Sequence, residues 1–235
     1  LNDNSKYALA ATKAGEVKNG GFGYQLAPTL KQIWTVAGRN NHQESVFMLM
    51  SCFTGCGGNY GNRNVGRLGL PNEAGGWQEV FGEIAYYEDM RTAAIAEGTM
   101  VRFNDTYVSE KITRGTQPFG SDWATWSDPH PILRKVAGSE NATWGSTNAD
   151  LNVIFMRYAD VLLMYAEATG RSGGNSADAW EALNMVRRRA AGLPVNIPNV
   201  AIDKTSGNLA EIAYTERKWE LAGEGERWYD LQRMQ

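Results

Sequence analysis

The strongest constraint on the fold is a helical pattern of apolar residues that begins near residue 157 and continues toward the last residue. Over Arg157–Thr169, apolar residues recur at intervals of three and four, which places them on one face of a helix. A second stripe follows over Ala179–Ala190. Between the stripes, Gly170 is expected to end the first helix and Ser176 to cap the second. The pattern therefore predicts two helices joined by a short turn.

The two helices together match a tetratricopeptide-like hairpin, whose repeat is about 34 residues long. One such hairpin cannot bury both of its faces alone, so it needs partner helices. A third helix is expected over Leu209–Arg233, where Gly223 and Gly225 indicate either close backbone packing or a break between two shorter helices. The sequence thus predicts a mainly α fold built from tetratricopeptide-like hairpins.

The first 150 residues have a different character, with short elements between long polar and glycine-rich stretches. The elements expected there are helices over Ser5–Val17 and Glu79–Met90, a buried strand over Glu44–Ser51, an extended segment or strand pair over 98–115, and loops over 54–77 and 116–150. Long loops inside a globular chain are usually functional. We therefore expect one domain with two parts: a loop-rich, ligand-binding part over residues 1–150 and a helical part over 151–235.

Charge and cysteine usage exclude several classes of function. The net charge of −3 argues against nucleic-acid binding, which usually needs a basic face. No apolar run approaches the length that spans a bilayer. Cys52 and Cys56 form either a local disulfide or two free thiols, since only His42 and His130 could join them in a zinc site. No metal ligand set is predicted.

Aromatic residues in polar loops indicate a binding surface. The chain holds eight Trp and ten Tyr, and several of them stand among Gly, Asn, Ser and Asp rather than on a periodic face. Aromatic rings stack on the apolar faces of sugar rings, while nearby polar side chains bond the hydroxyl groups. Any one ring could instead cover the core. The predicted ligand-binding residues are Tyr60, Trp77, Trp123, Trp126, Asn62 and Arg63.

The acidic pairs Glu224/Glu226 and Glu88/Asp89 raise the alternative of a glycosidase. That reaction needs two carboxyl groups that face each other across a cleft at roughly 5–10 Å, which adjacent acids on a helix do not supply. The sequence also lacks the Gly-x-Ser-x-Gly motif of a serine hydrolase. We expect no catalytic residue. Charged residues that are instead expected to pair between helices are Arg157, Glu167, Glu216, Arg217 and Arg227.

Three stretches of the helical part resemble the motifs of the SusD/RagB family of outer-membrane nutrient-binding lipoproteins. These stretches are Arg157–Ala168, Ala182–Pro194 and Glu216–Arg233. Their order and spacing agree with the family pattern. Weaker landmarks at Asn41–Phe47, Gly76–Trp77 and Glu88–Arg91 extend the resemblance over roughly residues 40–235.

The resemblance implies a lipid-anchored protein on the outer-membrane surface of a Bacteroidetes-like bacterium. Such a protein binds an oligosaccharide and passes it, uncleaved, to a SusC-like TonB-dependent transporter during starch or glycan utilisation. It also implies that this chain is a C-terminal portion, whose N-terminal half, signal and lipidated Cys lie outside it. No cofactor is expected, and a structural calcium ion stays open without any indication of one. The alternatives are a binder of peptides or other nutrients with the same fold, and a helical-repeat scaffold that binds only protein.

Overall fold

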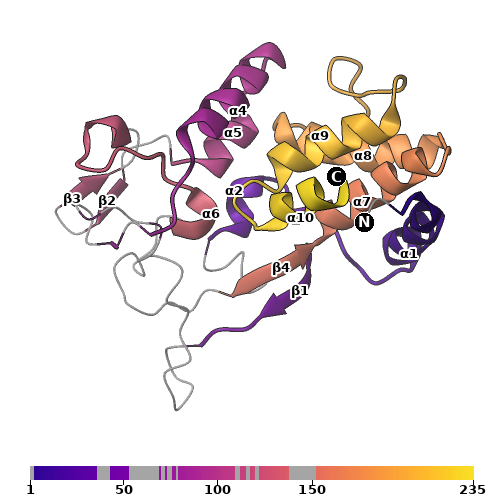
Figure 1. The fold of residues 1–235 in the computed structure, drawn as a ribbon, viewed down its shortest axis with the longest axis horizontal. Helices are drawn as coiled ribbons and strands as arrows, with labels where there is room; N and C mark the ends of the chain where they lie inside the picture. Colours follow the sequence, from indigo (N-terminus) through magenta and orange to yellow (C-terminus); the bar gives the residue numbers. More distant parts are fainter. Residues whose placement is uncertain are drawn as a thin grey trace. The chain divides into compact units, whose positions relative to one another are not determined.

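The computed structural model describes residues 3–35, 43–52, 69, 72, 76–77, 79–108, 112–114, 117–119, 122–137 and 152–235 (Figure 1). The chain divides into two compact units. Unit 1 consists of residues 1–28, 43–47 and 155–235, and unit 2 of residues 29–42 and 48–154. Helices dominate the described residues, which confirms the mainly α class. The division into a loop-rich part over 1–150 and a helical part over 151–235 stays a prediction.

Unit 1 is a layered set of helices around α7 (Figure 1). Its helices are α1 (Tyr7–Asn19), which follows the 3-10 turn Asn4–Lys6, then α7 (Tyr158–Arg171), α8 (Ala177–Ala190), α9 (Leu209–Glu220) and α10 (Glu226–Arg233). Helix α7 packs against α1, α8 and α9. Most of its apolar residues are buried, with Leu162 and Leu163 at 0% exposure, while Met164 and Tyr165 are partly buried. The predicted hairpin is therefore confirmed, and the Ser176 hydroxyl caps α8 by accepting a hydrogen bond from the Ala179 amide.

Two predictions about glycines in the helical part have different outcomes. Gly170 does not end the first helix, because α7 continues through it to Arg171. Gly223 and Gly225 do break the third helix, since their φ angles of 77° and 90° lie in the left-handed region that glycine adopts at little cost. The alternative of two shorter helices, α9 and α10, is thus confirmed.

Gly170 is needed for close contact between α7 and α9. A Cβ atom at this position would lie 2.6 Å from the backbone nitrogen of Ala210, which cannot move without shifting α9. Overpacking of this kind costs about 1–3 kcal/mol, whereas replacing a helical glycine by alanine gains only about 0.5–1 kcal/mol. We expect Gly170→Ala to lower the free energy of unfolding by about 1–2 kcal/mol in urea denaturation.

Gly15 in the middle of α1 supplies the matched control. A Cβ atom there would lie 3.2 Å from Cε2 of Tyr165, a side-chain atom that can shift. Gly15→Ala is expected to leave the free energy of unfolding unchanged or to raise it by up to about 1 kcal/mol. Equal effects of the two substitutions would show that the close contact between α7 and α9 does not cause the loss of stability in Gly170→Ala.

Unit 2 consists of short elements. They are α2 (Leu30–Ile33), α4 (Ile84–Ala96), α5 (Val101–Thr106), β2 (Ile112–Arg114), β3 (Gln117–Phe119), the 3-10 turn η4 (Trp123–Thr125) and α6 (Arg134–Ala137). The helix predicted from Glu79 begins only at Ile84, because the Glu83 side chain accepts hydrogen bonds from the Ala85 and Tyr86 amides and so caps it. The extended segment predicted over 98–115 is wrong at α5. Among the residues of that range that the structure describes, β2 is the one strand, and it pairs antiparallel with β3.

Strands β1 (Ser45–Leu49) and β4 (Val153–Arg157) form a two-stranded sheet. The predicted strand at β1 is therefore confirmed, but its predicted burial is wrong. Phe47 and Leu49 are 64% and 58% exposed, and the Phe47 ring contacts that of Phe155 at 5.7 Å between centroids. Side chains alternate between the faces of a strand, so a run of apolar residues places part of its side chains on the outer face. Beyond β1, Cys52 is disulfide-bonded, which decides the choice between disulfide and thiols.

Candidate functional site

A cluster of aromatic rings forms the centre of unit 2. The ring of Tyr87 on α4 lies 4.9 Å from that of Phe103, 4.8 Å from that of Tyr107 and 5.5 Å from that of Trp123. Tyr107 and Phe103 are almost fully buried, and burial raises the pKa of the Tyr107 hydroxyl. The contacts with Tyr107 and Trp123 are edge-to-face, an arrangement favoured by aromatic quadrupoles. The cluster thus packs α4, α5 and η4 against one another.

Two segments, 79–87 and 122–133, lie side by side next to this cluster. The Gly82 amide donates a hydrogen bond of 2.8 Å to the Pro131 carbonyl. The contact is close because Gly82 has no side chain: a Cβ atom would lie 2.9 Å from Cε1 of Tyr107 and 3.0 Å from Cγ of Pro131. The Val108 amide bonds the Ile132 carbonyl at 3.0 Å on the other side. The pairing therefore fixes the residues on either side of Gly82.

Partly exposed rings stand on these segments. Phe81 is 36% exposed and its ring lies against that of His130, with 3.9 Å between centroids. Trp77, two residues before the first segment, is 45% exposed. Trp123 and Trp126, at either end of η4, are half-buried. We call these five residues the aromatic surface: Trp77, Phe81, Trp123, Trp126 and His130.

The predicted ligand-binding residues fall into two groups. Tyr60, Asn62 and Arg63 lie outside the described residues, so their role stays a prediction. Trp77, Trp123 and Trp126 are described and have part of their rings open to solvent. Trp123 also supports the aromatic cluster through its contact with Tyr87, so ligand binding is not needed to explain it.

The structure adds Phe81 and His130, which the sequence analysis did not single out. Phe81 lies inside the helix predicted over Glu79–Met90, so it was not treated as a loop residue, whereas the helix begins only at Ile84. His130 gave no such signal, because its contact with Phe81 depends on the pairing of two segments that are far apart in the chain.

Polar groups accompany the rings. The Nδ1 atom of His130 lies 2.8 Å from Oδ1 of Asp128, whose side chain is about half exposed. The Glu83 carboxylate accepts hydrogen bonds from two backbone amides, which lowers its pKa. Carboxylate and imidazole groups beside flat rings are the donors and acceptors that hydroxyl-rich ligands require.

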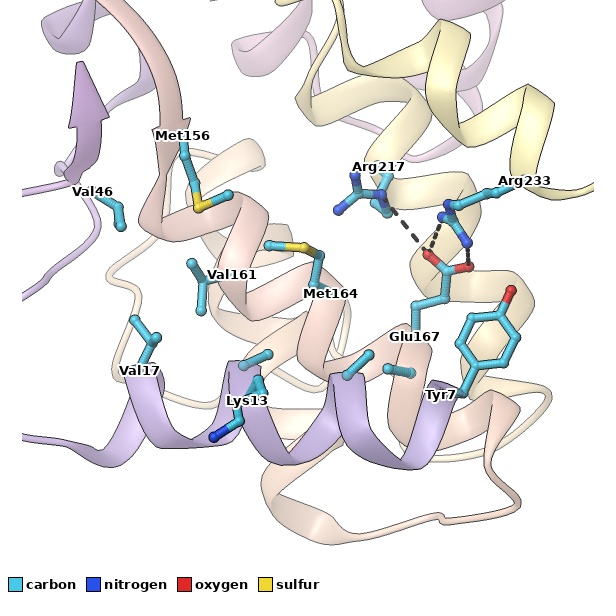
Figure 2. A pocket seen from close by; sticks show the side chains of 13 residues that line it. Tyr7, Lys13, Val17, Val46, Met156, Val161, Met164, Glu167, Arg217 and Arg233 are labelled. Atoms are coloured by element: carbon cyan, nitrogen blue, oxygen red, sulfur yellow. Dashed lines mark hydrogen bonds and ion pairs between the residues drawn. The ribbon is translucent and has the colours of Figure 1, made fainter. Parts of the chain in front are cut away.

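Unit 1 contains an apolar groove of about 420 Å³ along α1 and α7 (Figure 2). Its walls are Ala10, Ala14 and Val17 of α1, Val161 and Met164 of α7, Val46 of β1 and Met156 of β4. Glu167 lies at one end and accepts hydrogen bonds of 2.7 and 2.6 Å from the guanidinium of Arg233. The apolar wall suits hydrophobic side chains rather than sugar hydroxyls.

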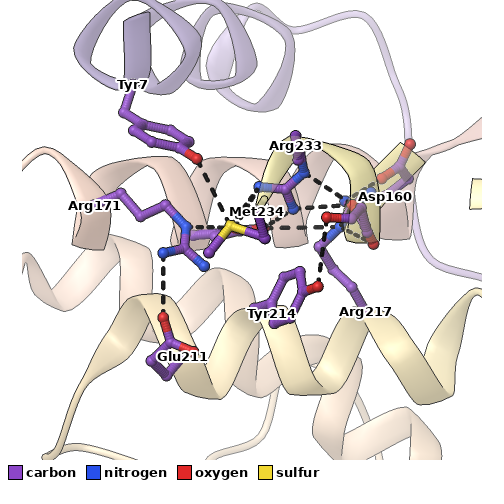
Figure 3. A network of polar contacts seen from close by, with 10 residues as sticks. Tyr7, Asp160, Arg171, Glu211, Tyr214, Arg217, Arg233 and Met234 are labelled. Atoms are coloured by element: carbon purple, nitrogen blue, oxygen red, sulfur yellow. Dashed lines mark hydrogen bonds and ion pairs between the residues drawn. The ribbon is translucent and has the colours of Figure 1, made fainter. Parts of the chain in front are cut away.

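A polar network connects α7, α9 and α10 at the same end (Figure 3). Arg217 bonds Asp160 and lies 3.1 Å from Oδ2 of Asp230, which in turn accepts a bond of 2.9 Å from Arg233. Arg171 reaches Glu211 at 3.1 Å. Because each of these charges has an opposite partner, the network is structural. It confirms the predicted pairing of Glu167 and Arg217.

Arg227 departs from the prediction of ion pairing. Its guanidinium lies over the ring of Tyr214 at 4.5 Å from the centroid, a cation–π arrangement. Glu216 behaves as predicted and accepts a hydrogen bond of 2.8 Å from Arg187.

The remaining predicted ion, Arg157, is at the centre of a buried cluster. It donates to Glu44 at 2.9 Å, to Glu220 at 2.8 Å and to both oxygens of Glu224 at 2.7 and 2.8 Å. Arg189 bonds Glu44 and Glu220. Burial alone lowers the pKa of Arg157, but the charges of the three carboxylates outweigh it and hold that pKa above its ordinary value. Glu224 is thus engaged in the fold, which removes it from any catalytic pair with Glu226.

The described residues also bear on metal binding and on membrane insertion. Within them, no group of three His, Cys, Asp or Glu side chains is arranged to hold a metal ion. Also within them, every helix is too short or too polar to cross a membrane.

Comparison with known proteins gives consistent matches. Residues 39–235 match the sequence model of the SusD family. SusD-like protein P38 of Formosa agariphila is 40% identical over 88 residues, which are 36% of this chain and 17% of that protein. SusD-like protein P25 of the same organism is 43% identical over 101 residues, 43% of this chain and 19% of that protein.

Solved structures share the fold. A SusD homolog from Bacteroides thetaiotaomicron superposes with a TM-score of 0.72 at 22% identity, covering 98% of this chain and 49% of that one. Surface glycan-binding protein A from the same species gives a TM-score of 0.68 at 23% identity, covering 99% of this chain and 51% of that one. The chain therefore spans about half the length of these structures.

Proposed function

The chain belongs to the SusD family, and from this premise we propose that it binds oligosaccharides through the aromatic surface of unit 2. The observation that carries the proposal is the set of partly exposed rings beside the aromatic cluster, with Trp77 at 45% and Phe81 at 36% exposure. Large rings are usually buried, and exposed ones on fixed backbone are suited to stacking on pyranose faces. Three of the solved structures with this fold are named as surface glycan-binding proteins.

Isothermal calorimetry with a panel of oligosaccharides tests the proposal. We expect at least one oligosaccharide to bind, and Trp77→Ala to weaken that binding about tenfold, because one lost stacking contact costs about 1.4 kcal/mol. Trp228→Ala is the matched control, since Trp228 is 65% exposed on α10 of unit 1. Its affinity should equal that of the unmodified protein.

Two results would contradict this reading. Trp77→Ala with full affinity would remove the aromatic surface as the site. Cleavage products in chromatograms of the same samples would contradict our further proposal that the chain is not an enzyme. That proposal is supported by the engagement of Glu224 with Arg157 and by the position of Glu88, which lies 3.6 Å from Arg91 on α4.

The apolar groove favours a second candidate, a peptide or protein binder of the same fold. Its methionine and valine walls suit an amphipathic helix or an apolar side chain. This candidate predicts that Met164→Glu abolishes binding of an amphipathic peptide, while the oligosaccharides give no heat in any variant. Oligosaccharide binding that Met164→Glu leaves unchanged would favour the first candidate.

We propose, from the family resemblance, that the protein works at the outer-membrane surface, held there by a lipid, and delivers its ligand to a SusC-like TonB-dependent transporter. The names of the matched surface glycan-binding proteins support a surface location. Digestion of intact cells with a protease tests it: the protein should be cleaved, and full protection would refute the surface location.

A further inference from the structure

The charged residues of the two described segments that carry most of these rings are predominantly negative. Segments 79–89 and 122–130 contain no Lys or Arg, and their one titratable base is His130. Their acidic residues all have exposed or half-buried side chains: Glu79, Glu83, Glu88, Asp89, Asp122 and Asp128. Arg134 and Lys135, which follow the second segment, are almost fully buried. Arg91 lies beside Glu88.

The backbone favours the charged form of one of these acids, Glu83. Hydrogen bonds from the Ala85 and Tyr86 amides lower the pKa of Glu83, although the nearby charge of Asp89 opposes this. His130 contacts Asp128 through its Nδ1 atom and the ring of Phe81 through its own ring. The two described segments therefore place acids, and no Lys or Arg, near the rings.

We propose that the aromatic surface takes uncharged oligosaccharides and discriminates against glycans that carry carboxylate or sulfate groups. The inference rests on the proposed function and adds the class of substrate. A sugar chain stacked on Phe81 or Trp77 brings its substituents close to these acids, well within the Debye length of about 8 Å at physiological salt. Like charges at such distances repel, whereas the same carboxylates accept hydrogen bonds from neutral hydroxyl groups.

The test compares matched neutral and charged ligands. The probes are maltohexaose, cellohexaose and mannohexaose, each used unmodified and after oxidation of its primary hydroxyl groups to carboxylates. We expect the unmodified form of the bound sugar to bind with nearly the same affinity in 20 mM and 300 mM NaCl. Its oxidised form should bind at least about tenfold more weakly at low salt, and the difference should shrink at high salt because salt screens the repulsion.

A charge variant separates electrostatics from shape. Glu79→Gln/Asp89→Asn removes two negative charges, both on exposed side chains. We expect it to strengthen binding of the oxidised sugar about threefold or more and to leave the unmodified sugar unaffected. An oxidised form that binds as tightly as its parent in the unmodified protein would overturn the charge inference and leave the proposed function standing. Absence of binding by all six probes would overturn both.

Discussion

Arg157→Met is expected to lower the free energy of unfolding by about 3–5 kcal/mol, because it leaves buried carboxylates without their counter-charge. Glu44, Glu220 and Arg157 all have side chains at 0% exposure, and that of Glu224 is at 8%. In the variant, Arg189 would still bond Glu44 and Glu220, but Glu224 would lose both hydrogen bonds that Arg157 donates to it. Methionine fills much of the volume, so the loss would report charge rather than a cavity. Urea denaturation followed by circular dichroism measures the change.

Two further variants make this result specific. Arg91→Met removes an arginine whose side chain is 50% exposed, and should change the free energy of unfolding by no more than about 0.5 kcal/mol. Adding Glu224→Gln to Arg157→Met removes one uncompensated charge and should recover part of the loss. If Arg157→Met cost less than about 1 kcal/mol, the cluster would not hold the helices together.

The sequence predicted the helices of unit 1 well because their signal is local. A period of three to four residues is visible in the chain itself, and α7, α8 and α9 bury the stripes that it indicates. The ion cluster was predictable in part, since Arg157 could be recognised as a paired charge. Glu44 could not, because a single acid before a strand carries no sign that it meets an arginine of β4 and another of α8.

The errors arise where tertiary contacts override local signals. In the sequence, Gly170 has the features of a helix terminator, but in the structure it lies within α7. Its lack of a side chain is needed there because the backbone of Ala210 on α9 lies against it. Phe47 is apolar and was expected to be buried. In the described structure it belongs to a two-stranded sheet of β1 and β4, and its side chain is exposed. Neither fact can be deduced from neighbours in the chain.

At the candidate site, too, residues with a local sequence signal could be predicted, and contacts between distant segments could not. Trp77 was found from its surroundings in sequence, since an aromatic residue among glycines is hard to explain by core packing. The contact between Phe81 and His130 depends on the pairing of their segments through Gly82 and Pro131, which no local pattern indicates. The residue that positions the rings is therefore a glycine with no ligand chemistry of its own.

Gly82→Val is accordingly expected to weaken oligosaccharide binding about 10- to 100-fold without a change at any ring. The new Cβ atom would lie within 3.0 Å of Pro131 and Tyr107, and Tyr107 cannot yield because it is 1% exposed and packed against Tyr87. The first segment must therefore move away from the second, which separates Phe81 from His130. Calorimetry with the oligosaccharide that binds the unmodified protein measures the loss.

The control for Gly82→Val places a valine at a neighbouring exposed position. Ala85 is exposed on the first turn of α4, so Ala85→Val should keep the affinity within about twofold. Phe81→Ala removes the ring itself and adds no atom near the backbone, so it should weaken binding about tenfold. This variant tests the ring even if Gly82→Val is too unstable to purify. Full affinity in Phe81→Ala would show that the ligand does not use this ring. Full affinity in a folded Gly82→Val protein would show that the spacing of the two segments does not govern recognition.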